Sequence, residues 1–249
     1  MKNLISVIIP FYKKRKYFIK TINSLKNQTY KNFEAIVVYD DPNKSDLKFV
    51  KKILKRIKYR KILINKTNIG VGFSRNEGIK KSKGALIAFL DADDVWHRNK
   101  LELQLKFMKL KKINFSYTSY QIIDNSKKII KKIIVPKEIN YKKLLYSCDI
   151  GLSSVMMKRN LLNKNKFKNL KTKEDYLLWL ILSKKGIKML GLNQVLFSWR
   201  KTQGSLSSST EQKLKDAFRM YNKHLKFSFL KSIFLTILLS INFIFKRYL

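Results

Sequence analysis

Residues 84–96 read GALIAFLDADDVW, in which six apolar residues are followed by three carboxylates within four positions. The apolar run 85–90 predicts a β-strand that is buried on both faces of a sheet. Asp91, Asp93 and Asp94 then fall at the carboxyl end of this strand, the edge of an open α/β sheet where ligands bind. Clustered carboxylates repel one another, so a cation among them would stabilise the cluster. The alternative interpretation is a solvated turn in which an aspartate caps the next helix.

The first 110 residues alternate between short apolar runs and segments with helical spacing. Strands are expected at 4–10, 33–39, 62–64 and 85–90, and helices at 17–25, at 46–57, within the glycine-containing segment 65–78 and around Leu101. This alternation predicts an α/β fold, with a Rossmann-like and mostly parallel central sheet flanked by helices.

The second half is less regular. Strands are expected at 115–123, 128–135, 148–157 and within 189–199, a helix at 172–183 and a loop at 204–207. We see no internal repeat and no Pro/Gly/Ser-rich linker that would divide the chain.

The 249-residue chain is strongly basic, with 55 Lys and Arg against 16 Asp and Glu and a formal charge of +39. The excess is mostly lysine spread along the whole chain, and no zinc-ligand spacing or RNA-recognition motif accompanies it. We therefore discount nucleic acid as a partner and retain an anionic membrane surface. Cys148 is the single cysteine, which excludes an internal disulfide, and the first apolar run is too short for a signal peptide. We expect a cytoplasmic protein.

The C-terminal segment from about residue 210 predicts helices. Leu214, Phe218, Tyr221 and Leu225 form an apolar stripe at helical spacing, and residues 232–245 carry no charge. Fourteen residues fall short of the roughly 20 that a spanning helix needs. We favour an interfacial amphipathic helix, with packing against the core or a second subunit and a short membrane span as the alternatives.

Three acidic clusters stand out in a chain so poor in acid: Asp40-Asp41, Asp91/Asp93/Asp94 and Glu174-Asp175. The first two follow strands of one sheet, so they can converge on one crevice. The DxD pair can hold Mg²⁺ or Mn²⁺ that bridges a diphosphate, and Arg75 can add charge-assisted hydrogen bonds. Glu174-Asp175 comes from the other half of the chain and could supply a general base, although both carboxylates could instead complement a helix N-terminus.

The segments SVIIPFYKK, FEAIVVYDD, NIGVGFSRNEG, ALIAFLDADDVW and KEDYLLWL occur in this order and resemble the family 2 glycosyltransferases with the GT-A fold. The resemblance covers residues 4–208. It implies an inverting transfer of a sugar from a nucleotide-diphosphate sugar, usually a UDP sugar, to an acceptor hydroxyl, with a divalent cation as cofactor. Residues 1–209 would form the catalytic domain, with a nucleotide-binding half (1–110) and an acceptor half (111–209), followed by a helical tail (210–249).

The resemblance also implies a role for individual residues. Pro10 and Tyr12 would line the base pocket, Asp40 or Asp41 would contact the nucleoside, Arg75 and Asn76 would lie near the diphosphate, and Asp91 would touch the ribose or donor sugar. Asp93 would hold the metal, and Asp175 would be the general base with Glu174 beside it. Asp94 and Arg200 are secondary or acceptor-site candidates, and Trp179 is either a core residue or an acceptor-site aromatic.

Two positions depart from the family pattern. Pro42-Asn43 stand where many relatives have glycine and serine, which leaves the choice between Asp40 and Asp41 open. Thr202 stands where relatives often carry a histidine, a potential metal ligand, so metal affinity is expected to be weaker.

These observations favour a membrane-associated enzyme that adds one sugar to a growing surface glycan or lipid-linked oligosaccharide. A sugar-nucleotide nucleotidyltransferase is the alternative enzyme, although it would need a basic, glycine-rich loop after the first strand. A basic non-enzymatic module that binds nucleic acid or a lipid surface is the third hypothesis.

Overall fold

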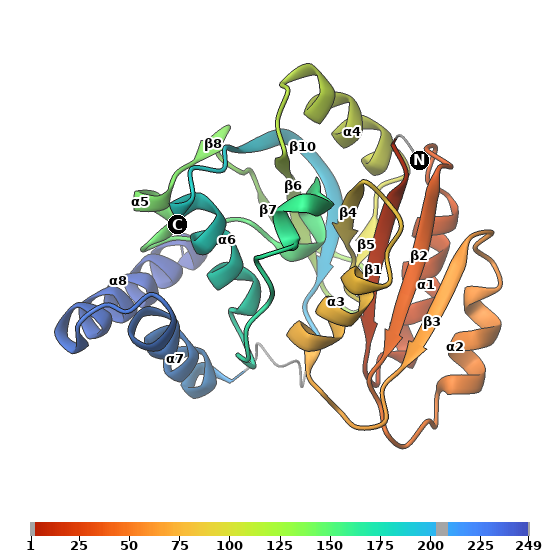
Figure 1. Cartoon of the computed structure of the whole chain (residues 1–249), viewed down its shortest axis with the longest axis horizontal. Coiled ribbons are helices and arrows are strands. Elements are labelled where there is room, and N and C mark those ends of the chain that lie inside the picture. The colour runs from red at the N-terminus through yellow and green to blue at the C-terminus, as the bar shows by residue number, and fades with distance from the viewer. Residues whose placement is uncertain (1–2, 203–208, 249) are drawn as a thin grey trace.

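Ten strands among the described residues form one mixed sheet (Figure 1). The computed structural model describes residues 3–202 and 209–248. The main path of the sheet follows the order β3-β2-β1-β4-β9-β6-β10-β5, with β7 paired to β6 and β8 paired to β10. The strands are β1 (Ile5–Phe11), β2 (Phe33–Tyr39), β3 (Arg60–Ile64), β4 (Leu86–Phe89), β5 (Val95–Trp96), β6 (Phe115–Ile123), β7 (Ile129–Ile133), β8 (Glu138–Ile139), β9 (Met156–Lys158) and β10 (Met189–Arg200).

The first four strands are parallel, so their carboxyl ends share one edge of the sheet. In register, Ile8 lies beside Ile36 on one side and Phe89 on the other. Every residue of β1 and β4 is buried, as expected for strands that helices cover on both faces. This arrangement places the residues that follow β1, β2 and β4 together at one edge.

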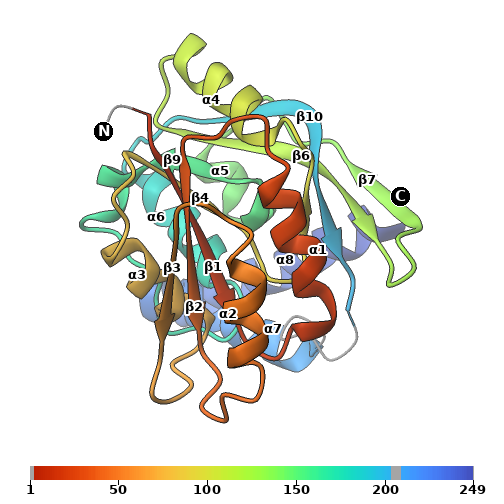
Figure 2. The ribbon, with the colours of Figure 1, turned by 90° about the vertical axis from the view of Figure 1, so that its right-hand side faces the viewer.

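Two apolar clusters fill the two faces of the sheet, because successive side chains of each strand point to opposite sides. Val7 and Ile9 belong to the cluster beneath α1 (Arg15–Lys26), α2 (Leu47–Leu54) and α4 (Lys100–Leu110). Ile8 belongs to the other cluster, which α3 (Val71–Lys80) and α6 (Glu174–Lys184) cover. Figure 2 views the molecule from the side of α1 and α2.

Helix α3 packs very closely on the sheet. A Cβ added at Gly78 would lie 2.6 Å from Cγ2 of Ile8 and 3.2 Å from Cγ2 of Val38. Since these distances leave no room for a side chain, the glycine permits the close approach of helix to strand. The approach fixes Arg75, one turn earlier on α3, against the edge of the sheet.

The second half of the chain adds antiparallel strands. β4 pairs antiparallel with β9, and β9 pairs antiparallel with β6, while β6 and β10 are parallel. The prediction of an α/β sheet with flanking helices is confirmed, and the sheet is mixed beyond β4. The strand expected at 148–157 is largely wrong: the chain forms a 3₁₀ turn at Leu152–Ser154, and only Met156–Lys158 pairs in the sheet.

The C-terminal segment is helical and lies at the end of the molecule opposite β3 and α2 (Figure 1). It comprises α7 (Thr210–Arg219), a π-helical turn (Met220–His224) and α8 (Phe229–Tyr248). Met220, Tyr221 and Leu225 are buried in the cluster that includes α6, but Leu214 is exposed, so the predicted apolar stripe is wrong at its first residue. The loop expected at 204–207 lies outside the described residues.

Helix α8 has two different faces. Leu235 and Leu239 are buried against the fold, whereas large apolar side chains on the other side are exposed. The exposed residues are Phe229, Leu230, Ile233, Phe234, Ile237, Ile241, Phe243, Ile244 and Phe245. Within 3–202 and 209–248, no helix combines the length and the apolar character that crossing a bilayer requires.

Candidate active site

Arg75 joins two acidic clusters that lie far apart in the sequence. Its Nη2 lies 2.9 Å from Oδ1 of Asp91, which follows β4, and its Nη1 pairs with Oε1 of Glu174 at the start of α6. The guanidinium also lies over the ring of Phe167, with 5.4 Å between Cζ and the ring centroid. The structure thus brings the end of β4 and the first turn of α6 to one buried arginine.

Burial and charge oppose each other at this arginine. Burial alone would lower the pKa of Arg75, but Asp91 and Glu174 raise it, so the guanidinium stays charged. Burial raises the pKa of Glu174 to about 7, although Arg75 opposes that rise. A buried carboxylate of this kind is retained only when it is paired, because an unpaired charge would be strongly destabilising.

Asp175 stands next to this ion pair and is partly exposed. Its Oδ1 accepts a hydrogen bond of 2.7 Å from the backbone N–H of Tyr176. Burial raises the pKa of Asp175, and the charge of Arg75 opposes the rise. A carboxylate at a site edge with a raised pKa is well suited to accept a proton from an acceptor hydroxyl.

The two aspartates after β2 have different surroundings. Asp40 is fully engaged by the chain: Oδ1 accepts hydrogen bonds from Asn65 Nδ2 (2.7 Å) and Ile69 N (3.0 Å), and Oδ2 accepts one from Gly70 N (3.0 Å). Gly70 has a φ of 84°, a conformation that favours glycine, and this turns its N–H toward Asp40. Asp40 therefore fastens the loop that leads into α3.

Asp41 keeps one oxygen free of protein partners. Its Oδ1 accepts a hydrogen bond of 3.2 Å from Asn43 N, while its buried Oδ2 has no hydrogen-bond partner among the described residues. A buried oxygen without a partner is costly, so this atom is suited to accept a hydrogen bond from a bound ligand.

Asp93 makes an ion pair at the same edge. Its Oδ2 lies 2.6 Å from Nζ of Lys14 and 3.4 Å from Oγ1 of Thr202. The Lys14 ammonium also donates to Oγ1 of Thr202 at 3.1 Å. Burial raises the pKa of Asp93, and the Lys14 charge acts against that rise.

Asp94 and Arg200 anchor the acidic loop after β4 (residues 91–94) through hydrogen bonds. Oδ1 of Asp94 accepts a hydrogen bond from the backbone N–H of Arg200 at 3.1 Å. The buried guanidinium of Arg200 donates to the backbone carbonyls of Asp93 (3.2 Å) and Asp124 (3.1 Å). These two residues fix the direction of the Asp93 side chain and leave it facing Lys14.

The remaining candidates divide between site and core. Tyr12 follows β1 at the ligand edge with 43% of its surface exposed, while Pro10 is buried within β1. The Asn76 amide is bound to the backbone of Phe167, donating at 2.9 Å and accepting at 3.0 Å. Trp179 is fully buried, with its ring edge-on to Phe115, and is therefore a core residue.

The candidate residues offer few ligands to a divalent cation. The described residues contain no cluster of three or more His, Cys, Asp or Glu side chains arranged to hold a metal ion. Asp93 can offer one carboxylate, which suffices for Mg²⁺ or Mn²⁺ only if phosphates and water supply the other ligands. The Lys14 ammonium already binds this carboxylate, so a cation would have to compete with it.

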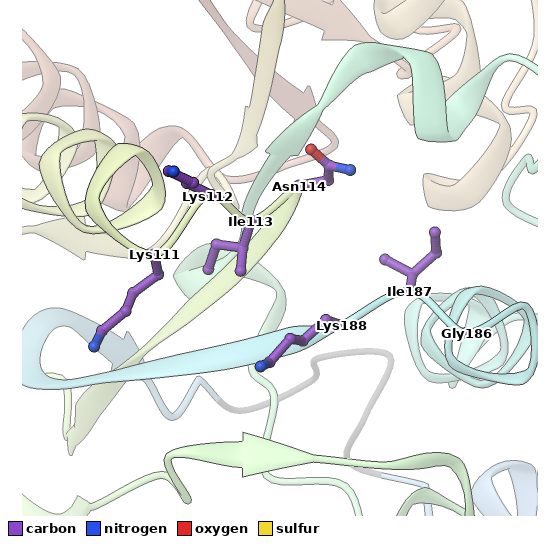
Figure 3. A pocket seen from close by; sticks show the side chains of 7 residues that line it. All are labelled: Lys111, Lys112, Ile113, Asn114, Gly186, Ile187 and Lys188. Carbon is purple, nitrogen blue, oxygen red and sulfur yellow. The ribbon is translucent and has the colours of Figure 1, made fainter.

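A pocket of about 260 Å³ lies elsewhere, at the opposite edge of the sheet (Figure 3). Its lining residues precede β6 and β10: Lys111, Lys112, Ile113, Asn114, Gly186, Ile187 and Lys188. The pocket therefore lies at the amino ends of β6 and β10. Because these strands run parallel to β4, their amino ends lie at the edge opposite the candidate site. The pocket contains none of the candidate site residues.

The sequence did not indicate two residues at the edge that carries the candidate site, Asn65 and Lys14. Asn65 directly follows β3, so the rule that places ligand-edge residues at strand ends could have found it. Lys14 gave no signal, since it lies in a run of basic residues within a lysine-rich chain.

Comparison with known proteins is consistent with this geometry. The family model for glycosyl transferase family 2 matches residues 6–170. The Escherichia coli UDP-Glc:alpha-D-GlcNAc-diphosphoundecaprenol beta-1,3-glucosyltransferase WfgD is 38% identical over 214 residues, which are 85% of this chain and 83% of that protein. The putative teichuronic acid biosynthesis glycosyltransferase TuaG of Bacillus subtilis is 32% identical over 93% of this chain and 92% of its own.

Two solved structures share the fold. S. aureus TarS in complex with UDP-GlcNAc matches with a TM-score of 0.73 and 20% identity, over 95% of this chain and 71% of that chain. The Pyrobaculum calidifontis mannosyltransferase PcManGT, in complex with GDP-Man and Mn2+, matches with a TM-score of 0.67 and 13% identity, over 93% of this chain and 69% of that chain.

Proposed function

The chain belongs to glycosyl transferase family 2, and we propose that it transfers glucose from UDP-glucose to a sugar hydroxyl on a polyprenyl diphosphate. The reaction class is that of a glycosyltransferase in surface polysaccharide synthesis. The donor and the acceptor follow the names of WfgD and a second E. coli β-1,3-glucosyltransferase, WfaP, which is 37% identical over 88% of this chain and 84% of its own length.

We assign the nucleoside to Asp41 and Tyr12. The free Oδ2 of Asp41 can accept the N–H of a uracil ring, whereas both oxygens of Asp40 are already occupied. The exposed Tyr12 ring at the end of β1 can stack on that base. These contacts would place the diphosphate toward Lys14 and Asp93.

The observation that carries the proposal is the Arg75 bridge between Asp91 and Glu174. It holds the first turn of α6 beside the end of β4. In the proposed complex Asp175 would then stand across the sugar from the nucleotide diphosphate. In a displacement that inverts the anomeric carbon, a carboxylate on this side takes the proton of the acceptor hydroxyl while the nucleotide diphosphate leaves on the other side. A β-linked product from an α-linked UDP-glucose requires this inversion.

A divalent cation bound to Asp93 and to the donor phosphates would neutralise charge on the leaving diphosphate. PcManGT, which shares the fold, was solved in complex with GDP-Man and Mn2+. In this chain Asp93 would be the protein ligand, and water would complete the coordination.

We further propose that α8 rests on the inner face of the membrane that carries the acceptor. Its outward face exposes Leu230, Phe234 and Phe245, and lysines are plentiful in the flanking sequence. Apolar side chains of such a helix insert into the boundary between headgroups and acyl chains, and basic residues attract anionic lipid. The catalytic edge would then be held close to a lipid-linked substrate.

The test is transfer of radiolabelled glucose from UDP-glucose to a synthetic GlcNAc-diphosphate-polyprenol. We expect wild-type transfer, and a loss of about 10²–10⁴-fold in Asp175→Asn, the contribution typical of a general base. UDP binding, measured by calorimetry, should be unchanged in this variant, because Asp175 faces the acceptor. Transfer within a few-fold of wild type in Asp175→Asn would refute its role, and no transfer from any UDP sugar would refute the function.

A further inference from the structure

Lys14 places a positive charge beside Asp93, the residue that would hold a metal ion. The residue lies just beyond the carboxyl end of β1, and its ammonium is held between Oδ2 of Asp93 (2.6 Å) and Oγ1 of Thr202 (3.1 Å). Both Lys14 and Asp93 are partly exposed at the ligand edge, with 27% and 15% of their side-chain surfaces accessible. The Lys14 ammonium is therefore held in place by two side chains and can still be reached by a ligand.

Among the residues that the structure describes, two acceptors bind the Lys14 ammonium, which leaves it one N–H donor for a ligand. A lysine ammonium has three N–H donors, and here Asp93 and Thr202 accept two of them. The third can donate to a phosphate oxygen, which is a common partner of lysine. Asp93 and Thr202 thus orient the ammonium toward whatever anion occupies the edge.

The residue at position 202 supports the same conclusion. A hydroxyl accepts a hydrogen bond from an ammonium, but as a neutral group it is a weaker ligand for a divalent cation than an imidazole or a carboxylate. Thr202 is buried and contacts both partners of the ion pair. The local chemistry of this chain therefore favours an ammonium over a divalent metal beside Asp93.

We propose that Lys14 is a tethered counter-charge for the donor diphosphate and competes with divalent metal for Asp93. The inference rests on the proposed function, since it takes the diphosphate of a nucleotide sugar as the ligand. It predicts that the protein binds UDP without a divalent cation and binds Mn²⁺ alone weakly, because the ammonium repels the metal and occupies its carboxylate.

The experiment is calorimetric titration of UDP into wild type and Lys14→Met, each in EDTA and in Mn²⁺. Wild-type affinity in EDTA should lie within about 10-fold of that in Mn²⁺. Lys14→Met should lose at least about 10-fold in EDTA and recover in Mn²⁺. Titration of Mn²⁺ into each protein without nucleotide, followed by electron paramagnetic resonance, should show tighter metal binding by Lys14→Met.

Lys16→Met is the matched control, because it removes the same charge from an exposed position in the first turn of α1, which Lys14 directly precedes. It should leave both UDP affinities, in EDTA and in Mn²⁺, at wild-type values, and thermal unfolding should show that both variants are folded. Wild type that binds UDP only with Mn²⁺ would overturn the inference. So would a Lys14→Met variant whose UDP and Mn²⁺ affinities match wild type. In either case glucose transfer by wild type would leave the proposed function intact.

Discussion

The sheet edge at the carboxyl ends of β1, β2 and β4 (the ligand edge) differs from the outer face of α8 in how its side chains are stabilised. At the edge, buried charges are neutralised within the protein, as in the pairs of Arg75 with Asp91 and Glu174. On α8, Leu230 and Phe234 expose 78% and 62% of their surfaces, and no part of the described chain covers them. The edge is therefore preorganised before any substrate arrives, whereas α8 is stabilised further only by an additional apolar surface. The contrast can be tested by removing the buried ion pairs at the edge and the exposed apolar side chains on α8.

Arg75→Met should produce the largest loss of stability. It would leave the buried Glu174 carboxylate without its partner, and breaking one side of a buried ion pair costs about 3–5 kcal/mol. Urea denaturation monitored by circular dichroism measures the change. Arg75→Met combined with Glu174→Gln should regain part of the loss, because the buried charge is gone.

Arg15→Met is the control for that variant. Arg15 pairs with Asp46 at 3.2 Å, but its side chain is 59% exposed, so the loss should stay below about 1 kcal/mol. Equal losses in the two arginine variants would mean that the ion pairs at the edge are no more important than those on the surface.

Removing the apolar face of α8 should weaken membrane binding. We expect the double variant Phe234→Ser, Ile237→Ser to bind vesicles with anionic lipid at least about 10-fold less tightly, since each buried apolar side chain contributes about 1.5–3 kcal/mol. Vesicle co-sedimentation measures this affinity. Both residues are exposed, so the free energy of unfolding in buffer should change little.

Leu110→Ser offers a matched control on α4, where Leu110 is 74% exposed. Its vesicle binding should equal that of wild type. Unchanged binding by the α8 double variant would show that the exposed face does not meet the bilayer.

A smaller effect should come from Lys100, a buried ammonium that lacks a carboxylate partner in the described structure. Its Nζ donates to Oε1 of Gln104 at 2.8 Å and lies 4.2 Å from the ring centroid of Trp96. Burial lowers the pKa of Lys100 to about 7, whereas an unfolded lysine titrates near 10.4. Between these values the unfolded chain binds one more proton than the folded protein, so stability rises with pH.

The slope due to Lys100 should be at most about 1.4 kcal/mol per pH unit above pH 7. Urea denaturation at pH 7, 8 and 9 should show this rise in wild type and a flatter dependence in Lys100→Met. If the free energy of unfolding changed with pH equally in the two proteins, the Lys100 ammonium would stay charged although no carboxylate pairs with it. A buried cation would then not need the kind of pairing that Arg75 has.

Much of the architecture follows from local patterns. The buried runs of β1, β2 and β4 were correctly predicted because strands covered on both faces are continuously apolar, and the acidic residues then follow from where those strands end. The irregular stretch before β9 could not be predicted this way. There the backbone bends so that Gly151 packs against Phe197 (a Cβ would lie 3.1 Å from Cζ), and a partner 46 residues away leaves no local trace.

The site shows the same limit. Residue type and position indicated Arg75, Glu174 and Asp175, but not that Arg75 would bind Glu174, because that pairing depends on how the two halves meet. An asparagine can face a ligand or a backbone, and Asn76 bonds to Phe167, so its role near the diphosphate stays a prediction. Lys14 was hidden among 55 basic residues, and only its geometry distinguishes it.

The close fit between α3 and the segment before α6 bears on attempts to change acceptor specificity by recombination. A Cβ at Gly72 would lie 3.3 Å from Cγ of Glu174 and 3.3 Å from the carbonyl oxygen of Lys168, and Asn76 fastens Phe167 from the next turn. A chimera that imports an acceptor half should therefore import α3 with it. A crossover placed after α3 would separate surfaces that were shaped together, so the better junction lies in the loop before it.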